Sequence, residues 1–182
     1  MSIRKTTFDG DKGVCYMLTE YKGQIFNVSI EGNQAKLWIY KFVEGFEKYT
    51  TEYTTDNGDY ELTYYEKTVP ITEISGLFSI LFEVFIGELP FSIDDVRENN
   101  NIVVLCSNID YANEHGFSEL ERGVWIAEKS IDLFDKIQMK KCNEDTNEDT
   151  ITDLNKQQFI DMWNKYEFEP SISYFFKNQT NN

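Results

Sequence analysis

Residues 71–86, ITEISGLFSILFEVFI, contain the most apolar run of the chain and decide its fold class. Their apolar side chains recur at spacings of three and four, at Ile71, Ile74, Leu77, Phe78, Leu81, Phe82 and Phe85. This period is typical of a helix that is largely buried, and Gly87 and Pro90 follow it as stop signals. We therefore expect a helix that covers a sheet, with a groove-filling or dimerisation helix as the alternative. The run is too short for a membrane span, which needs about 20 residues.

The sequence before this run predicts an antiparallel sheet. Phe26, Val28 and Ile30 alternate with polar residues, which is the period of a half-buried strand. Asn57-Gly58 separates two runs rich in Thr and Tyr, and this pair favours a tight hairpin because both residues accept positive φ. The pattern predicts a meander of about five strands, at residues 14–20, 24–30, 35–43, 47–54 and 60–69.

The second half mixes both kinds of element. A helix N-cap is predicted at Ser92, with Asp94 and Asp95 in the first turn, and residues 102–105 suit a central strand. Residues 118–121 resemble a capping box, and residues 124–137 fit a strand followed by a helix better than one helix. Further predictions are a helix over 153–166 and an edge strand or packed tail over 172–176. The expected class is α+β: an N-terminal antiparallel β-meander packed by a buried helix, with short strands and helices after it.

The tandem tetrapeptide NEDT-NEDT at residues 143–150 indicates how the chain is divided. An octamer that is wholly acidic or polar is typical of a solvated segment. We expect an α+β core domain over 1–142, an acidic linker or loop over 143–151, and a C-terminal helix and tail over 152–182. The last part is expected to pack on the core, so that the chain forms one domain overall.

The charge balance excludes some partners and favours others. The chain has 32 Asp and Glu against 17 Lys and Arg, a net charge of −15, yet 15% of its residues are aromatic. That aromatic content allows a real core, so the charge belongs on a folded surface. Such a surface disfavours nucleic acid, which is bound through Lys and Arg, and attracts basic proteins. The N-terminus lacks the apolar stretch of a signal peptide, so we expect a cytoplasmic protein, in the host-cell cytoplasm if it is phage-encoded.

Catalytic motifs are scarce in the sequence. His115 is the only histidine, and no glycine-rich phosphate loop is present. A dyad of Cys106 and His115 would need the fold to bring them together. The turn around Asp56 and Asp59 lacks most ligands of a calcium loop. We expect no catalytic residues, no metal and no cofactor.

Interaction surfaces remain as candidates. Tyrosine offers a large, rigid contact area with a polar tip, and a neighbouring carboxylate pairs with Arg or Lys of a partner. The alternative is that these tyrosines only line a sheet face. The predicted partner-binding residues are Glu52, Tyr53, Asp59, Tyr60 and Glu61 in the hairpin, and Glu144, Asp145, Glu148 and Asp149 in the acidic segment.

These features leave three classes of function. The first is a non-enzymatic acidic inhibitor that binds a basic nucleic-acid-handling protein and blocks nucleic-acid binding or cleavage. In kind, this is similar to phage anti-CRISPR proteins and to immunity proteins against nuclease toxins, although no family motif accompanies the likeness. The second is a protein-interaction module or dimeric adaptor without a nucleic-acid connection, and a homodimer fits this class. The third is a small enzyme or ligand-binding protein with a carboxylate or Cys/His pocket.

Overall fold

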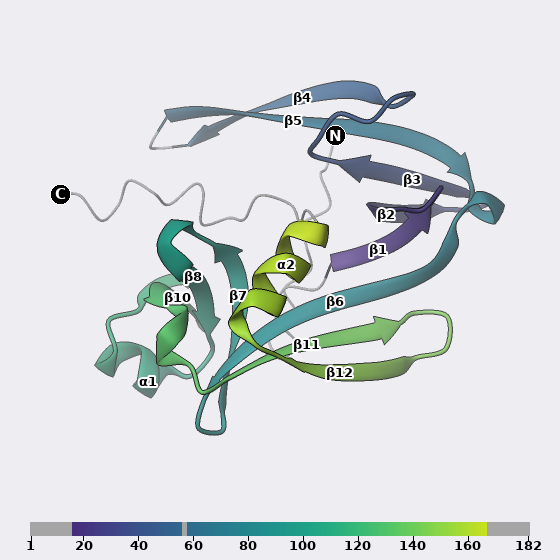
Figure 1. Cartoon of the computed structure of the whole chain (residues 1–182). Helices are drawn as coiled ribbons and strands as arrows, with labels where there is room; N and C mark the ends of the chain where they lie inside the picture. Colours follow the sequence, from purple (N-terminus) through teal and green to yellow (C-terminus); the bar gives the residue numbers. More distant parts are fainter. Residues whose placement is uncertain (1–15, 56–57, 167–182) are drawn as a thin grey trace.

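The computed structural model describes residues 16–55 and 58–166, most of which lie in β-strands (Figure 1). Within these residues, twelve strands form one antiparallel sheet. The helices are α1 (Ile109–Glu114) and α2 (Lys156–Tyr166), with short 3-10 helices η1 (Ile71–Glu73), η2 (Glu98–Asn100) and η3 (Ile131–Leu133). The strands are β1 (Tyr16–Tyr21), β2 (Gln24–Glu31), β3 (Gln34–Ile39), β4 (Glu47–Thr55), β5 (Gly58–Pro70), β6 (Ser75–Ile86), β7 (Leu89–Val96), β8 (Asn101–Cys106), β9 (Ser118–Glu121), β10 (Val124–Ser130), β11 (Lys136–Asn143) and β12 (Glu148–Leu154).

The long strand β6 organises the sheet because three strands pair with it. Ile80 pairs with Tyr16 of β1 and with Lys141 of β11, so these two strands lie on opposite edges of β6. Val84 likewise pairs with β7 on one edge and with β11 on the other. Two branches therefore leave the same edge of β6: β1-β2-β3-β5-β4 from its first half and β7-β8-β10-β9 from its second half.

The helix expected over 71–86 is wrong, because residues 75–86 form the strand β6. Phe78, Ile80, Phe82 and Val84 alternate along one face, and Leu81 is also buried on the other. A strand that is apolar on both faces has no period-2 pattern, and its apolar residues then fit a helical period equally well. Pairing along both edges decides in favour of the strand.

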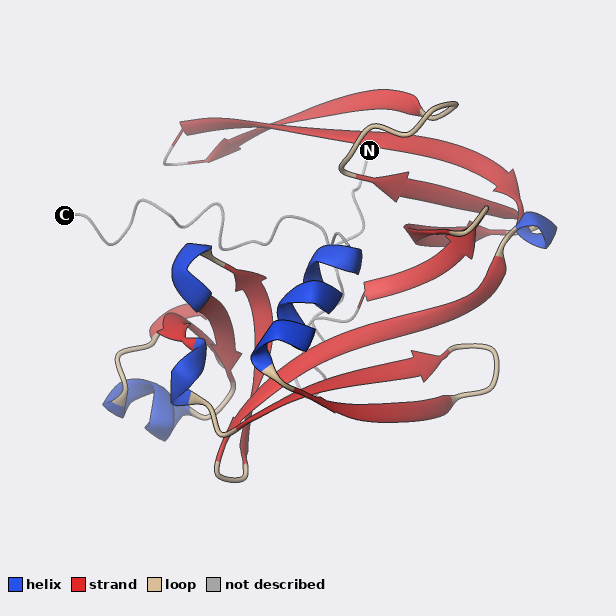
Figure 2. Ribbon diagram, in the orientation of Figure 1, coloured by secondary structure: helices blue, strands red, loops and turns tan. Residues whose placement is uncertain are grey.

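The expected α+β class is also wrong, since the described chain is mostly antiparallel sheet (Figure 2). The helix start predicted at Ser92 lies within β7, and the capping box at 118–121 is β9. The strand predicted after residue 124 is confirmed as β10, but only the three-residue 3-10 helix η3 follows it before β11 begins, in place of the longer helix expected there. The strand at 102–105 is confirmed as β8. The edge strand or tail expected at 172–176 lies outside the described residues.

The predicted N-terminal strands are confirmed, but their order is not that of a meander. β5 lies between β3 and β4, so β4 ends this branch of the sheet. β4 and β5 form an antiparallel hairpin in which Thr55 pairs with Gly58, and residues 56–57 of the predicted turn lie outside the described part.

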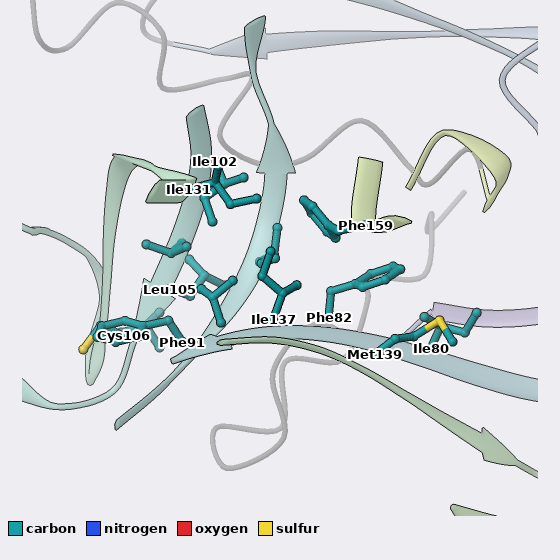
Figure 3. Packing of buried hydrophobic residues seen from close by; sticks show 14 of the residues in the cluster. Ile80, Phe82, Phe91, Ile102, Leu105, Cys106, Ile131, Ile137, Met139 and Phe159 are labelled. Atoms are coloured by element: carbon teal, nitrogen blue, oxygen red, sulfur yellow. The ribbon is translucent and has the colours of Figure 1, made fainter. Parts of the chain in front are cut away.

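The C-terminal helix is confirmed as α2, which begins three residues later than expected. Asn155 Oδ1 accepts a 2.9 Å hydrogen bond from the Gln158 amide, and Gln158 Oε1 accepts one of 2.9 Å from the Asn155 amide. This reciprocal capping fixes the start of the helix. Phe159 is fully buried and packs edge-on against Phe82 of β6, with ring centres 5.3 Å apart (Figure 3).

The buried residues form two clusters. The larger one joins β6, β7, β8, β10 and β11 to α2. The smaller one lies on the opposite face of the β1–β5 branch, where Phe46 of the β3–β4 loop stacks on Phe26 with ring centres 5.0 Å apart. In Figure 1, β4 and β5 lie above α2 and β6 lies below it, so the sheet curves around the helix. Within the described residues, no helix is long and apolar enough to cross a membrane.

Candidate functional site

The β4–β5 hairpin holds the first group of predicted partner-binding residues and divides it between two faces. Glu52 pairs directly with Glu61, and both side chains are exposed. Tyr53 pairs with Tyr60 at the next position, which belongs to the opposite face because successive strand residues alternate. Position 59 pairs with Thr54, on the same face as Glu52. The side chains of Tyr53, Asp59 and Tyr60 lie outside the described part of the structure.

The face shared by positions 53 and 60 contains a described pair of tyrosines. Tyr49 and Tyr64 are cross-strand partners, and their rings stack with centres 5.6 Å apart and planes 17° apart. The Tyr49 hydroxyl donates a 2.8 Å hydrogen bond to Glu47 Oε2, and this bond, together with the carboxylate charge, raises the pKa of Tyr49. Glu47 is itself the direct partner of Glu66. We call Glu47, Tyr49, Tyr64 and Glu66 the tyrosine ladder.

The two carboxylates of the tyrosine ladder differ in their partners. Glu66 forms a 3.1 Å ion pair with Lys36 of β3, and its side chain is only 15% exposed. Glu47 is exposed and holds the Tyr49 hydroxyl, which is a neutral donor. The negative charge of Glu47 is therefore not offset by that contact, and it lies beside two stacked rings.

The register places the tyrosine ladder on the sheet face that carries α2. Direct pairs join Glu66 to Trp38, Trp38 to Asn27, Asn27 to Leu18, and Leu18 to Phe78. Directly paired residues share a face. Phe78 lies on the same face of β6 as Phe82, which packs on α2, because every second residue of a strand points to the same side. The ladder thus lies on β4 and β5, the strands at the far end of the branch that curves around α2 (Figure 1).

The tyrosine ladder is not among the predicted residues, because the prediction grouped tyrosines with carboxylates that are adjacent to them in the sequence. Glu52 and Tyr53 are adjacent in sequence but lie at positions of opposite faces, whereas Glu47 and Tyr49 are two apart and share one. The spacing Glu-x-Tyr in β4, mirrored by Tyr-x-Glu at 64–66 in β5, is the signal that would have found it.

The second group of predicted residues lies at the tip of the β11–β12 hairpin. The expected linker or loop over 143–151 contains the end of β11, a turn at 144–147 and the start of β12. Asn143 Oδ1 accepts from the amides of Asp145 and Thr146, at 2.9 and 3.2 Å. The Glu144 amide donates to the Leu77 carbonyl at 2.9 Å, and Asp145 Oδ2 accepts from the Leu77 amide at 3.3 Å. The turn is therefore attached to β6.

Two further carboxylates of this hairpin, those of Glu148 and Asp149, also have partners within the chain. Asp149 forms a 2.6 Å ion pair with Lys140 of β11, and this contact raises the pKa of Lys140. Glu148 accepts a 3.3 Å hydrogen bond from the Thr146 hydroxyl. In Figure 1 the end of β4 and the start of β5 lie far from the turn between β11 and β12, so the structure does not bring the two predicted groups together.

The only histidine lines a small aromatic pocket. His115 stacks on Tyr111 with ring centres 3.8 Å apart, and its Nδ1 donates a 2.9 Å hydrogen bond to the Tyr111 carbonyl. The pocket has a volume of about 190 Å³, below the roughly 300 Å³ at which small-molecule sites begin. Its lining residues are Ile86, Phe91, Tyr111, His115, Phe117, Lys129, Leu133 and Phe134.

Cys106 is not among the residues that line this pocket. The thiol is buried at the end of the apolar strand β8, and it donates to the Asn108 carbonyl at 3.5 Å. Burial raises the pKa of Cys106, which disfavours the reactive thiolate. Over residues 16–55 and 58–166, no three side chains of His, Cys, Asp or Glu gather as metal ligands would.

Comparison of the chain with protein-family models, with curated proteins and with solved structures found no match.

Proposed function

We propose that this protein is an acidic inhibitor that binds a basic nucleic-acid-handling protein, of the nuclease or CRISPR-effector kind, and blocks its nucleic-acid binding or cleavage in the cytoplasm. The observation that carries the proposal is the tyrosine ladder: two stacked rings beside the exposed Glu47 carboxylate, on a chain with net charge −15. No catalytic step is assigned to the chain in this proposal.

The chemistry of the ladder fits a guanidinium group. Arg stacks on aromatic rings and forms paired hydrogen bonds with carboxylates. Tyr49 provides the ring and Glu47 the carboxylate, two residues apart on the same face of β4. Tyrosine loses little conformational entropy on binding and is enriched where interface energy concentrates. An Arg or Lys that the partner uses to hold nucleic acid is thus the group that the ladder would occupy.

The net charge supports the same partner by a separate route. A surface with an excess of carboxylates speeds encounter with a basic protein and disfavours other acidic surfaces. This contribution falls with added salt because the Debye length shortens. The ladder contributes contact area that salt does not screen, so the complex is expected to weaken in salt without being abolished.

The test is capture from a host lysate with the tagged protein, followed by a nucleic-acid-binding assay on the purified partner. Glu47→Gln removes the charge and keeps the shape, and it should weaken the complex by about fivefold, the effect of one exposed ion pair. Glu88→Gln is the matched control, because it makes the same charge change in the exposed β6–β7 turn. A captured partner that keeps full nucleic-acid binding and cleavage while bound would overturn the proposal and favour a module without a nucleic-acid connection.

A further inference from the structure

Three strands end the described sheet, and each of them is paired on one side only: β4, β9 and β12. An unpaired strand edge presents amide and carbonyl groups that can pair with another chain. Proteins usually protect such edges with charges, bulges, proline or short length. The three edges of this sheet differ in how far they are protected.

Two of these edges carry recognisable protection. β9 has only four residues, and its register with β10 shifts between Val124 and Trp125. β12 has three exposed acidic residues, Glu148, Asp149 and Asp153, so a second copy of β12 would meet like charges. Either edge therefore opposes the addition of another strand.

The β4 edge is the least protected of the three, because its charged residues are of both signs and no bulge or proline interrupts it. It runs for nine residues, EKYTTEYTT, without proline and without a register shift against β5. Its composition of Thr and Tyr favours strand pairing. Its charged residues are Glu47, Lys48 and Glu52, so the edge itself is nearly neutral in a chain whose net charge is −15.

We propose that β4 pairs antiparallel with β4 of a second copy of this chain, about a two-fold axis at Thr50. Symmetric pairing about Thr50 sets Lys48 opposite Glu52 of the partner subunit, and Glu52 opposite Lys48 of the partner subunit. Opposite charges at directly paired positions stabilise a sheet. Pairing about Lys48 or about Glu52 would place two like charges opposite each other. Pairing about Tyr49 or about Thr51 would leave Lys48 and Glu52 each opposite an uncharged residue, without the ion pairs.

The existing neighbours of these side chains favour the same register. Glu52 is exposed and faces the like-charged Glu61 across the hairpin, while Lys48 faces Tyr65. A lysine on the open side of Glu52 offsets the repulsion from Glu61. Thr50 already meets Thr63 through hydroxyl oxygens 3.3 Å apart, and the partner's Thr50 extends this row of threonines.

This pairing goes beyond the proposed function and does not depend on it. Lys48, Thr50 and Glu52 belong to the face opposite the tyrosine ladder, so the ladder stays open in the dimer. The two ladders then lie on one face of a continuous sheet. A partner with two basic sites would gain affinity from binding both.

The test is sedimentation velocity over a range of protein concentrations, with charge reversals in β4. The wild-type chain should form a dimer, and Lys48→Glu or Glu52→Lys alone should weaken it by at least about tenfold, because each creates two like-charge contacts. An equimolar mixture of these two variants should form a heterodimer, since every 48–52 contact is then again between opposite charges. The double variant Lys48→Glu/Glu52→Lys should dimerise alone.

Glu88→Lys is the control, because it makes the same charge change as Glu52→Lys at an exposed turn, and it should leave the dimer unchanged. Circular dichroism of each variant checks that the sheet is intact. A wild-type chain that stays monomeric up to about 1 mM would overturn the proposal. Dimerisation that survives both single reversals, or a variant mixture that stays monomeric, would overturn the register.

Discussion

The Tyr49 hydroxyl donates a 2.8 Å hydrogen bond to Glu47 Oε2, two residues away on the same face of β4. This contact holds the tyrosine neutral, because ionisation would break the bond and place two negative charges together. It also fixes the Tyr49 ring over Tyr64.

The Tyr49 contact predicts a coupled titration. In the wild-type protein, Tyr49 should titrate above the ordinary tyrosine value of 10.0, and Glu47→Gln should bring its pKa back toward that value. Because the pKa of Tyr49 is higher in the folded protein than in the unfolded chain, its contribution to stability is present at a pH below the pKa of the unfolded chain. This contribution is lost as the pH rises through the pKa of the folded protein. Nuclear magnetic resonance of tyrosine ring carbons measures this shift directly. An identical Tyr49 titration in both proteins would mean that the contact does not form in solution.

A second pH dependence is expected from Glu83 in the middle of β6. Burial raises the pKa of Glu83, and the nearby Lys140 lowers it in part. Because the pKa of Glu83 is higher in the folded protein, its contribution to stability is greatest at a pH below its pKa in the unfolded chain. This contribution is lost as the pH rises past its pKa in the folded protein. Glu83→Gln should therefore increase the free energy of unfolding at neutral pH and change it little in acid. Urea unfolding at both pH values provides the comparison, and a variant that is less stable at neutral pH would contradict it.

The packing of α2 on the sheet predicts a large effect of one core substitution. Phe159 is fully buried against Phe82 and Trp163, so Phe159→Ala should lower the free energy of unfolding by about 3–5 kcal/mol. Asn164→Ala, at an exposed position of the same helix, is the control and should have little effect. Equal losses for both variants in denaturant unfolding would show that α2 is not held by this contact.

The central place of β6 predicts where amide hydrogen exchange is slowest. Residues 80 and 83–84 pair on both edges, whereas β4 is paired only with β5 in the described chain. Amides in the middle of β6 should thus exchange only on global unfolding, and alternate amides of β4 should exchange much faster in the monomeric Lys48→Glu variant. Fast exchange throughout residues 78–85 would contradict the strand assignment.

Local signals in the sequence located much of the fold. The strands on either side of Asn57-Gly58 were predicted because the turn chemistry and the Thr/Tyr content agree, and α2 was predicted because Phe159 and Trp163 recur at a helical spacing. Residues 71–86 were misassigned because apolar side chains on both faces of a central strand erase its alternation. Two of the strands that pair with β6, at residues 16–20 and 136–143, are far away in sequence and leave no local signal. The third, β7, follows directly after the turn at residues 87–88, and Gly87 and Pro90 are equally compatible with the end of a helix.

The candidate site was predicted less well than the fold, for a related reason. Acidic and tyrosine content pointed to the β4–β5 hairpin, but cross-strand register decides which side chains share a face. Tyr49 and Tyr64 become neighbours only through that register. In the acidic turn, the contacts of Asp145 and Asp149 with β6 and β11 likewise depend on pairing between distant segments.

The most direct test of the proposed function is the affinity of the captured partner for wild-type protein, Glu47→Gln and Glu88→Gln, measured by calorimetry at low salt and at roughly 0.5 M salt. The expected result is a basic partner whose binding to nucleic acid is lost in the complex, with Glu47→Gln about fivefold weaker at low salt and Glu88→Gln unchanged. Equal affinities for all three proteins, or a complex that still binds nucleic acid, would contradict a role for the tyrosine ladder in inhibition.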